Sequence, residues 1–331
     1  MLRWAIFLFV AACLPIGEPN DVDTDDGEVG SEKKTSTFRV VTWNIESVGS
    51  TGSTQFQAAQ SILQRLDADI VGINEVDDID KSYLEQLAEN LHYNYVLIPS
   101  SNPFGSLRNA LLSRFEFVDS KIHTSAALSS DNDANDLTRL PVSAVLDLPN
   151  TDKNLAVVVQ HWKSGFDDSD EFRRAIDGQR TAQAALTWNA ELAIVMGDVN
   201  AQVDDMPDSP SNFGAIPSGT PYSYWLGADL YSLLDSSGVP NSPFAPFLDA
   251  GFVTVEASQL DGRTGTRESG RRIDYLMVNP ALAAATIDAE VYDSRDESFG
   301  GLEKWGEPLE RATSAEASDH YPVFADFTFE L

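Results

Sequence analysis

Cysteine, histidine and basic side chains are scarce in this chain of 331 residues, which has one cysteine and four histidines. A single cysteine excludes an internal disulfide, so no disulfide framework supports the fold. Lys and Arg number 22 against 52 Asp and Glu, which gives a net charge of −30 and a pI of about 4.2. Because an acidic surface repels polyanions at long range, this balance argues against tight binding of nucleic acid, although a bound divalent cation reverses the potential locally.

The apolar run at the N-terminus is too short to cross a bilayer. It has the layout of a targeting segment: Met1–Arg3 is basic, Trp4–Val10 is apolar, and small residues precede Cys13. This order resembles a bacterial lipoprotein signal, in which the cysteine is lipidated; an ordinary signal peptide with an incidental cysteine is the alternative. We predict a signal at residues 1–13, membrane attachment through lipidated Cys13, and a place in the bacterial cell envelope (outer membrane or cell surface) or secretion.

Composition divides the rest of the chain into a tether and one domain. Residues 14–36 mix Asp and Glu with Pro, Gly, Ser and Thr and have no apolar period, which predicts a disordered acidic linker. Strand-like and helix-like patterns fill residues 37–331. Residues 201–247 are rich in Pro, Ser, Gly and aromatic residues but lack a core-sized apolar pattern, so we interpret them as a loop insertion rather than a second domain.

Strands and helices alternate along this domain, which predicts an α/β fold. The predicted strands lie at 38–43, 68–73, 95–98, 110–112, 142–148, 155–159, 192–196, 273–278 and 323–329, and the predicted helices at 56–66, 83–91, 171–189 and, briefly, 230–234.

Acidic and amide side chains, and two of the four histidines, stand close to the ends of these predicted strands. They are Asn44, Glu46, Glu75, His161, Asp198, Asn200, Asp319 and His320. Hydrolysis of a phosphate ester needs a cation, an activated water and donors for the phosphate oxygens. Carboxylate and amide oxygens suit a hard ion such as Mg²⁺. Because neighbouring residues of an extended chain point in opposite directions, Asp319 can face a metal while His320 faces the phosphate. The residues therefore predict a divalent-metal phosphoesterase.

The segments that carry these residues resemble the endonuclease/exonuclease/phosphatase superfamily, whose fold is that of deoxyribonuclease I. Each match is weak alone, but all occur in the family's order from about residue 38 to 331. They are Thr42–Ile45, Ala68–Glu75, Asn109–Arg114, Gln160–Ser164, Met196–Ala201, Arg272–Tyr275 and Ser318–Pro322. The resemblance implies a four-layer α/β sandwich of two packed, mainly antiparallel sheets flanked by helices, and it makes residues 37–331 a catalytic domain.

The resemblance also implies roles for single residues. The metal, Mg²⁺ or alternatively Mn²⁺ or Ca²⁺, would be bound by Glu75 with Asn44, Asp319 and Glu46 nearby. The catalytic residues would be His161, Asp198, Asn200, Asp274 and His320, with Asp274 orienting His320. We expect the substrate phosphate to contact Arg108, Asn109 and Lys163. Asn74 stands where the family usually has glutamine, and Gln160 where it often has asparagine or threonine; these departures leave the catalytic side chains in place but leave the substrate class open.

The segment around His161, followed by Arg173, Arg174 and Arg180, looks most like bacterial extracellular nucleases of the family. We therefore predict an extracellular or surface-anchored endonuclease that cleaves DNA or RNA by metal-assisted attack of water, with residues 263–272 as a phosphate-tracking loop.

Two alternatives remain. The first is a sphingomyelinase-like or small-molecule phosphodiesterase or phosphatase of the same fold, acting on phospholipid or small phosphoesters, for which the aromatic segment from Phe213 to Trp225 would lie exposed near the cleft. The second is a lipoprotein that binds without catalysing. The sequence indicates no protein partner, and we expect a monomer.

Overall fold

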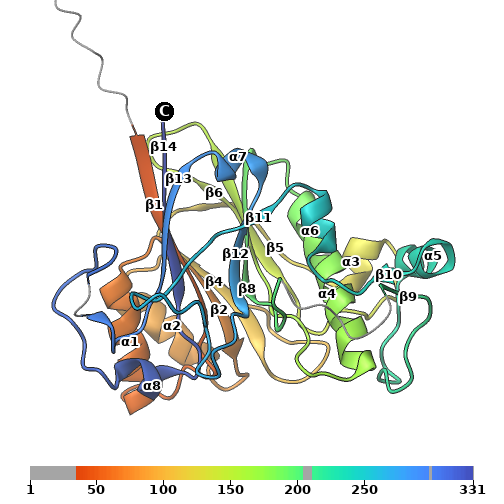
Figure 1. Cartoon of the computed structure of the whole chain (residues 1–331), viewed down its shortest axis with the longest axis horizontal. Helices are drawn as coiled ribbons and strands as arrows, with labels where there is room; N and C mark the ends of the chain where they lie inside the picture. Colours follow the sequence, from red (N-terminus) through yellow and green to blue (C-terminus); the bar gives the residue numbers. More distant parts are fainter. Residues whose placement is uncertain (1–34, 204–210, 298–299, 331) are drawn as a thin grey trace, which may run out of the picture. The chain divides into compact units, whose positions relative to one another are not determined.

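The computed structural model describes residues 35–203, 211–297 and 300–330. Within them, two six-stranded sheets pack face to face and helices cover the outer face of each sheet (Figure 1). This four-layer arrangement confirms the predicted fold class. The predicted signal at 1–13 and the linker up to residue 34 lie outside the described residues, and the first strand begins at Thr35, inside the last two residues of the predicted linker.

The first sheet has the order β13-β14-β1-β2-β4-β3. Its strands are β1 (Thr35–Asn44), β2 (Ile70–Val76), β3 (Tyr95–Leu97), β4 (Arg108–Ser113), β13 (Thr286–Val291) and β14 (Val323–Glu330). Only β1 and β2 are parallel neighbours; the other pairs are antiparallel.

The second sheet has the order β11-β12-β8-β7-β6-β5. Its strands are β5 (Phe117–Ile122), β6 (Val142–Asp147), β7 (Asn154–Val159), β8 (Leu192–Asp198), β11 (Val253–Thr254) and β12 (Asp274–Val278). Here β7 and β8 form the one parallel pair. Each sheet therefore has a parallel pair at its centre, whose two strands end at the same edge.

The central strands are apolar along their whole length because both faces of each sheet are covered. In β1, Phe38 and Val40 point into the core between the sheets, whereas Val41 and Trp43 point toward the helices on the outer face. The two sheets approach closely at Gly72, where a Cβ atom would lie 2.8 Å from the Cε of Met196 in the facing sheet. A larger residue at Gly72 would have to displace the Met196 side chain.

Different helices cover the two outer faces. The first sheet is covered by α1 (Thr54–Leu66), α2 (Lys81–Asn90) and α8 (Thr313–Ala317). The second is covered by α4 (Asp168–Leu186) and α6 (Ala245–Asp249), with α3 (Ser125–Ser129) and α5 (Ala228–Ser236) packed beside α4 and the short α7 (Pro280–Ala283) next to β8. Among the described residues, no helix combines the length and apolarity needed to cross a membrane.

The segment predicted as a loop insertion contributes α5 and a small sheet of β9 (Asn212–Phe213) and β10 (Val239–Pro240). Phe213 and Tyr224 from this segment pack edge-on against Phe172 of α4. The two-residue strands β9, β10 and β11 were not predicted from the sequence, and neither were two longer strands, β5 and β13. The two longer ones, β5 and β13, are edge strands with many exposed positions, so they lack the apolar signature of the central strands.

Candidate active site

The polar residues found at the predicted strand ends meet at one rim of the sandwich. Asn44 ends β1, Glu75 stands near the end of β2, and Asp198 ends β8. Asp274 begins β12, the antiparallel neighbour of β8, and lies directly opposite Asp198. A hydrogen bond of 3.0 Å from Asn44 Nδ2 to Asp198 Oδ2 joins the two sheets at this rim. The carboxyl ends of both parallel pairs therefore supply one site.

Asp198 occupies the centre of the site. Its Oδ2 atom lies 3.5 Å from His161 Nε2 and 3.9 Å from His320 Nε2, while its Oδ1 accepts a 2.8 Å hydrogen bond from the backbone of Asn200. Burial raises the pKa of Asp198 to about 7, with a further contribution from the negative charge of Asp274, although His320 acts in the opposite direction. A carboxyl group that titrates near neutral pH is a hallmark of acid–base sites.

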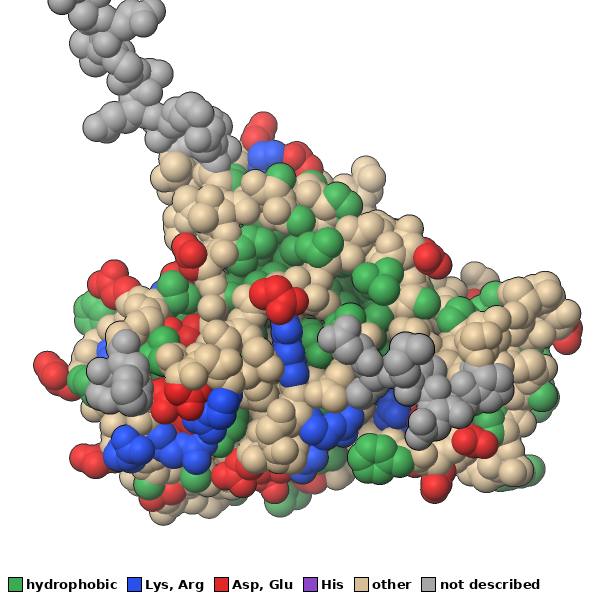
Figure 2. Space-filling model, viewed as in Figure 1, with side chains coloured by type: hydrophobic (Ala, Val, Ile, Leu, Met, Phe, Trp, Pro, Cys, Tyr) green, Lys and Arg blue, Asp and Glu red, His purple; other side chains and the backbone are tan. Residues whose placement is uncertain are grey.

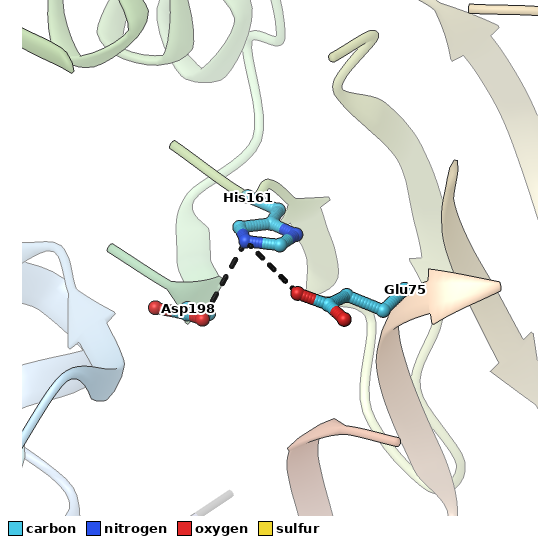
Figure 3. A group of neighbouring side chains, drawn as sticks. All are labelled: Glu75, His161 and Asp198. Carbon is cyan, nitrogen blue, oxygen red and sulfur yellow. Dashed lines mark ion pairs between the residues drawn. The ribbon is translucent and has the colours of Figure 1, made fainter. Parts of the chain in front are cut away.

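His161 lies between Asp198 and Glu75, and one ring nitrogen faces both carboxylates (Figure 3). The Nε2–Oε1 distance to Glu75 is 3.7 Å. Burial, together with the positive charges of Arg139, His320 and Lys163, holds the pKa of His161 well below its usual range. Asn200 Nδ2, which also donates to Trp162 O at 3.0 Å, lies 3.1 Å from Nε2. These contacts indicate a neutral imidazole that accepts at Nε2.

His320 is held in the opposite protonation state. Its Nδ1 atom lies 2.9 Å from Asp274 Oδ2, which also accepts a 2.7 Å bond from the Thr266 hydroxyl. Burial opposes the charging of His320, but the carboxylates of Asp274, Asp198 and Asp319 together raise its pKa to about 9. His320 is therefore an oriented imidazolium whose Nε2 points toward Asp198 and Asp319.

Three residues in or beside the motif segments of the site have a strained backbone. Glu46, Glu75 and Asn200 have φ values of 58°, 62° and 52°, in the left-handed region that side chains seldom adopt. Glu75 also sits at a register shift between β2 and β4. At Gly197, with φ 138°, a Cβ atom would lie 1.9 Å from Gln160 O, so only glycine fits beside β7. Such distortions persist where the surrounding fold enforces a functional geometry.

Asn74 braces the site from within the core. Its Oδ1 accepts from the backbone N–H of Asp198 at 2.8 Å, and its Nδ2 donates to Asn109 Oδ1 at 2.9 Å and to Gln160 O at 2.8 Å. In the sequence, Asn74 stands out only as a departure from the family pattern. Asn109, predicted to contact substrate, is fully buried behind Asn74 and also donates to Leu140 O.

The other predicted residues lie around this centre. Asp319 Oδ1 is 3.7 Å from His320 Nε2, while Asp319 Oδ2 forms a 2.6 Å ion pair with Arg267. Glu46 is exposed. Arg108 donates to Ser100 O at 3.0 Å and pairs with Asp78, and Lys163 Nζ pairs with Asp170 at 2.8 Å. Arg108 and Lys163 are thus engaged within the chain.

Two groups of side chains at the rim are close enough to hold a metal ion. One consists of Glu75, His161 and Asp198, and the other of Asp198, Asp274 and His320. In the second group Asp274 and His320 already bond to each other, so the first group, with the amide of Asn44 beside it, is the better cation site. Its donors are mainly oxygens, which fits a hard divalent ion. Of the three acidic residues predicted as metal ligands, Glu75 belongs to the first group, and Glu46 and Asp319 belong to neither.

Arg139 is a residue of the site that sequence analysis missed. Its Nη1 donates to Trp162 O at 3.2 Å, the same carbonyl that accepts from Asn200. Burial lowers the pKa of Arg139, while the charges of Glu75, Asp177 and Asp198 act to raise it. Arg139 stands in the loop before β6, outside every segment that carried the resemblance, so only the folded chain reveals its position.

Comparison with known proteins agrees with this architecture. The model of the Endonuclease/Exonuclease/phosphatase family matches residues 41–320. The chain therefore belongs to this family. No curated protein matches it significantly.

Solved structures share the fold at low identity. An endonuclease/exonuclease/phosphatase from Beutenbergia cavernae is 17% identical, with a TM-score of 0.54 over 89% of this chain and 72% of that one. The catalytic domain of human Nocturnin is 16% identical, with a TM-score of 0.53 over 89% and 97%. The 3′ phosphatase NExo from Neisseria, bound to a product DNA hairpin, is 18% identical, with a TM-score of 0.53 over 88% and 99%. At these identities the likeness extends to the fold and leaves the substrate open.

Proposed function

We propose that this member of the endonuclease/exonuclease/phosphatase family is a divalent-metal-dependent phosphodiesterase that hydrolyses DNA or RNA. The observation that carries the proposal is the placement of Asp198 within 3.9 Å of both a neutral His161 and a charged His320, beside the carboxylate of Glu75. Together, the buried carboxylate, the two histidines and the oxygen-rich cation site supply the proton acceptor, the hydrogen-bond donor and the cation that hydrolysis of a phosphate ester needs.

We assign most residues around Asp198 to steps of this reaction. Glu75, Asn44 and Asp198, with Asp319 adjacent, would hold a divalent ion, which when bound polarises a phosphoryl oxygen and stabilises its developing charge. Asp198, kept in place by Asn44 and the backbone of Asn200, accepts the proton of the water whose oxygen bonds to phosphorus. The bond from phosphorus to the sugar oxygen breaks, and that oxygen leaves and takes up a proton from solvent. His320, oriented by Asp274, donates from Nε2 to a phosphate oxygen.

Basic side chains support nucleic acid as the substrate. The chain is strongly acidic as a whole, yet most of the Lys and Arg side chains on one face gather on its lower half, below the main hydrophobic area and among Asp and Glu side chains (Figure 2). Arg139, which forms no ion pair within the described residues, lies next to Trp162 of the active site, and Arg267 lies there too, although Asp319 pairs with it. A local positive potential inside an acidic surface can retain a polyanion near the reacting centre.

The lipid alternative has weaker support. Of the four aromatic residues expected to lie exposed for it, Phe213 and Tyr224 are each only 7% exposed and pack against α4, whereas Tyr222 and Trp225 are exposed. Two separate aromatic side chains do not make the continuous apolar surface that a membrane substrate requires. Sphingomyelin and small phosphoesters remain comparison substrates in the test.

We further propose that the enzyme acts in the bacterial cell envelope, anchored through a lipid on Cys13, or is secreted. The support is the order of basic, apolar and small residues ahead of the single cysteine. Metabolic labelling with a radioactive fatty acid tests the anchor, because Cys13→Ala should abolish incorporation; equal labelling of both proteins would contradict it.

The purified protein should nick plasmid DNA with Mg²⁺ or Mn²⁺ and lose this activity in EDTA. His320→Ala serves as the inactive control, because contaminating nucleases would persist in it. If DNA and RNA stay intact while sphingomyelin or a small phosphate ester is hydrolysed, the substrate assignment moves to the alternative. If no phosphoester is cleaved with any metal, the proposal fails.

A further inference from the structure

A small pocket opens beside the catalytic residues. It has a volume of about 200 Å³, and we call it the side pocket; its walls include Phe104, Ser106, Thr138, Arg139, Lys163 and Arg173. The pocket adjoins the active site through Trp162, whose backbone carbonyl accepts from both Arg139 and Asn200. A group bound in the side pocket would therefore lie next to the reacting centre.

Arg173 is the most unusual residue of the side pocket. It is 6% exposed, and its guanidinium carbon lies 4.8 Å from the ring centre of Phe104 and 5.6 Å from that of Tyr224. Its Nε and Nη2 atoms are buried without a hydrogen-bond partner. In the part of the chain that the structure describes, Arg173 forms no ion pair. Asp177, on the same helix, already accepts from the backbone N–H groups of Thr138 and Lys163, at 2.8 Å each.

A buried arginine without a carboxylate partner lowers the stability of the folded protein, and this chain has many acidic residues that could have served as partners. The sequence offers 52 acidic residues for 22 basic ones, so partners are plentiful. Burying a cation without a counter-ion is unfavourable, and stacking on aromatic rings offsets only part of that cost. Arg139 repeats the pattern, since it too forms no ion pair within the described residues. The carboxylate of Asp177 acts on both charges from a distance but forms an ion pair with neither arginine. Two neighbouring guanidinium groups without an ion-pair partner make a site for an anion, and their planar forks match phosphate.

We infer that the side pocket binds a second phosphate of the substrate, one that flanks the scissile phosphate on a nucleic-acid strand. This inference rests on the proposed function, because the scissile group must occupy the site around Asp198. A nucleic-acid backbone supplies phosphates at a regular spacing, whereas sphingomyelin carries a single phosphate. The ring of Phe104 adds an apolar wall for the sugar that joins the two phosphates. Contacts of this kind position the strand without reading its sequence.

The test compares a substrate that has flanking phosphates with one that has none. We expect Arg173→Gln to lower the ratio of kcat/KM for the oligonucleotide d(TpTpTpT) to kcat/KM for bis(p-nitrophenyl) phosphate by about tenfold, the value of one charge-assisted hydrogen bond. Lys153→Gln is the matched control, because it removes one positive charge before β7 begins, at the end opposite His161. A ratio that stays at the wild-type value in Arg173→Gln would overturn the inference.

A binding measurement separates this inference from the proposed function. Thymidine 3′,5′-bisphosphate is titrated in EDTA by calorimetry, so no catalysis is needed. Arg173→Gln should weaken its affinity about tenfold. If the wild-type protein hydrolyses no substrate but shows this difference, the proposed function fails while the anion site stands. Affinity equal to wild type in Arg173→Gln would refute the site even in an active enzyme.

A second variant guards against misfolding of the first. Ser106→Glu introduces a carboxylate into the loop wall of the side pocket without changing α4. It should weaken the binding of thymidine 3′,5′-bisphosphate at least as much as Arg173→Gln does. Circular dichroism checks that each variant is folded. Unchanged affinity in a folded Ser106→Glu protein would also overturn the inference.

Discussion

Two arginine-bearing flanks border the active site, and they differ in how their charge is balanced. We call residues 261–272 the arginine loop. There Arg263 pairs with Asp261 at 2.6 Å, Arg267 with Asp319 at 2.6 Å, and Arg272 with Glu256 at 2.7 Å. In the side pocket, Arg139 and Arg173 form no ion pair within the described residues. The side pocket is thus the flank whose positive charge is left for a ligand.

The contrast shows that counting basic residues is a poor guide to an anion site. The sequence favoured residues 263–272 as a phosphate-tracking loop because four arginines cluster there. The structure gives Arg263, Arg267 and Arg272 carboxylate partners, so a phosphate would have to compete with an existing ion pair there. The absence of an ion-pair partner, rather than the presence of charge, distinguishes the two flanks.

The largest effect is expected at Asp198, where the two flanks meet. Asp198→Asn keeps the shape of the side chain but removes the proton acceptor and one carboxylate of the cation site, so kcat for DNA should fall by about 10³-fold or more. Single-turnover cleavage measures this loss, and circular dichroism checks the fold. Activity within about tenfold of wild type would show that another group activates the water.

The second-largest effect is expected on stability at Asp177, which supports two walls of the side pocket through the backbone of Thr138 and Lys163. Burial raises the pKa of Asp177 from 3.8 to about 6. The pKa of Asp177 is therefore higher in the folded protein than in the unfolded chain, so protonation of Asp177 favours the folded state. This contribution to the free energy of unfolding is complete below pH 3.8 and is lost as the pH rises through 6. The stability of wild type relative to Asp177→Asn should therefore decrease by about 3 kcal/mol across that range.

Urea unfolding of both proteins at a series of pH values measures this difference. Comparing the two proteins cancels the contribution of other acidic groups. A difference in unfolding free energy that stays constant from pH 4 to 7 would contradict the raised pKa.

The smallest effect is expected in the arginine loop. Arg267 donates two hydrogen bonds to one oxygen of Asp319 and so fixes the position of that carboxylate. Arg267→Gln removes this support and should weaken Mn²⁺ affinity about tenfold, as expected when a metal ligand loses the residue that orients it. Arg263→Gln is the control, because its exposed ion pair with Asp261 contributes little and the change should alter affinity less than about twofold. Calorimetric titration with Mn²⁺ measures both. Equal effects of the two variants would mean that Asp319 lies outside the metal site.

Much of the fold could be predicted because its central strands carry strong local signals. The apolar runs that became β1, β7 and β8 are followed by polar residues, and the carboxyl ends of neighbouring parallel strands meet at one edge. The edge strands β5 and β13 gave no such signal because many of their side chains face solvent.

The rest of the site depends on contacts between distant segments. Arg139 approaches Trp162 only after β6 and β7 pair, and Asn74 reaches Asp198 only when the two sheets pack. Arg108 and Glu46 stand in or beside motif segments, yet one turns to Asp78 and the other is exposed. Local sequence predicts which residue types are present near the rim, but not which of them share a partner.

The most direct test of the account compares Glu75 with Glu46, since both were predicted as metal ligands and both have positive φ. Only Glu75 faces His161, and Glu46 is exposed. The Mg²⁺ concentration that gives half-maximal DNA cleavage should rise more than about tenfold in Glu75→Gln but less than about threefold in Glu46→Gln. Metal dependence unchanged in Glu75→Gln would contradict the placement of the cation, and with it the assignment of this rim as a metal-dependent phosphodiesterase site.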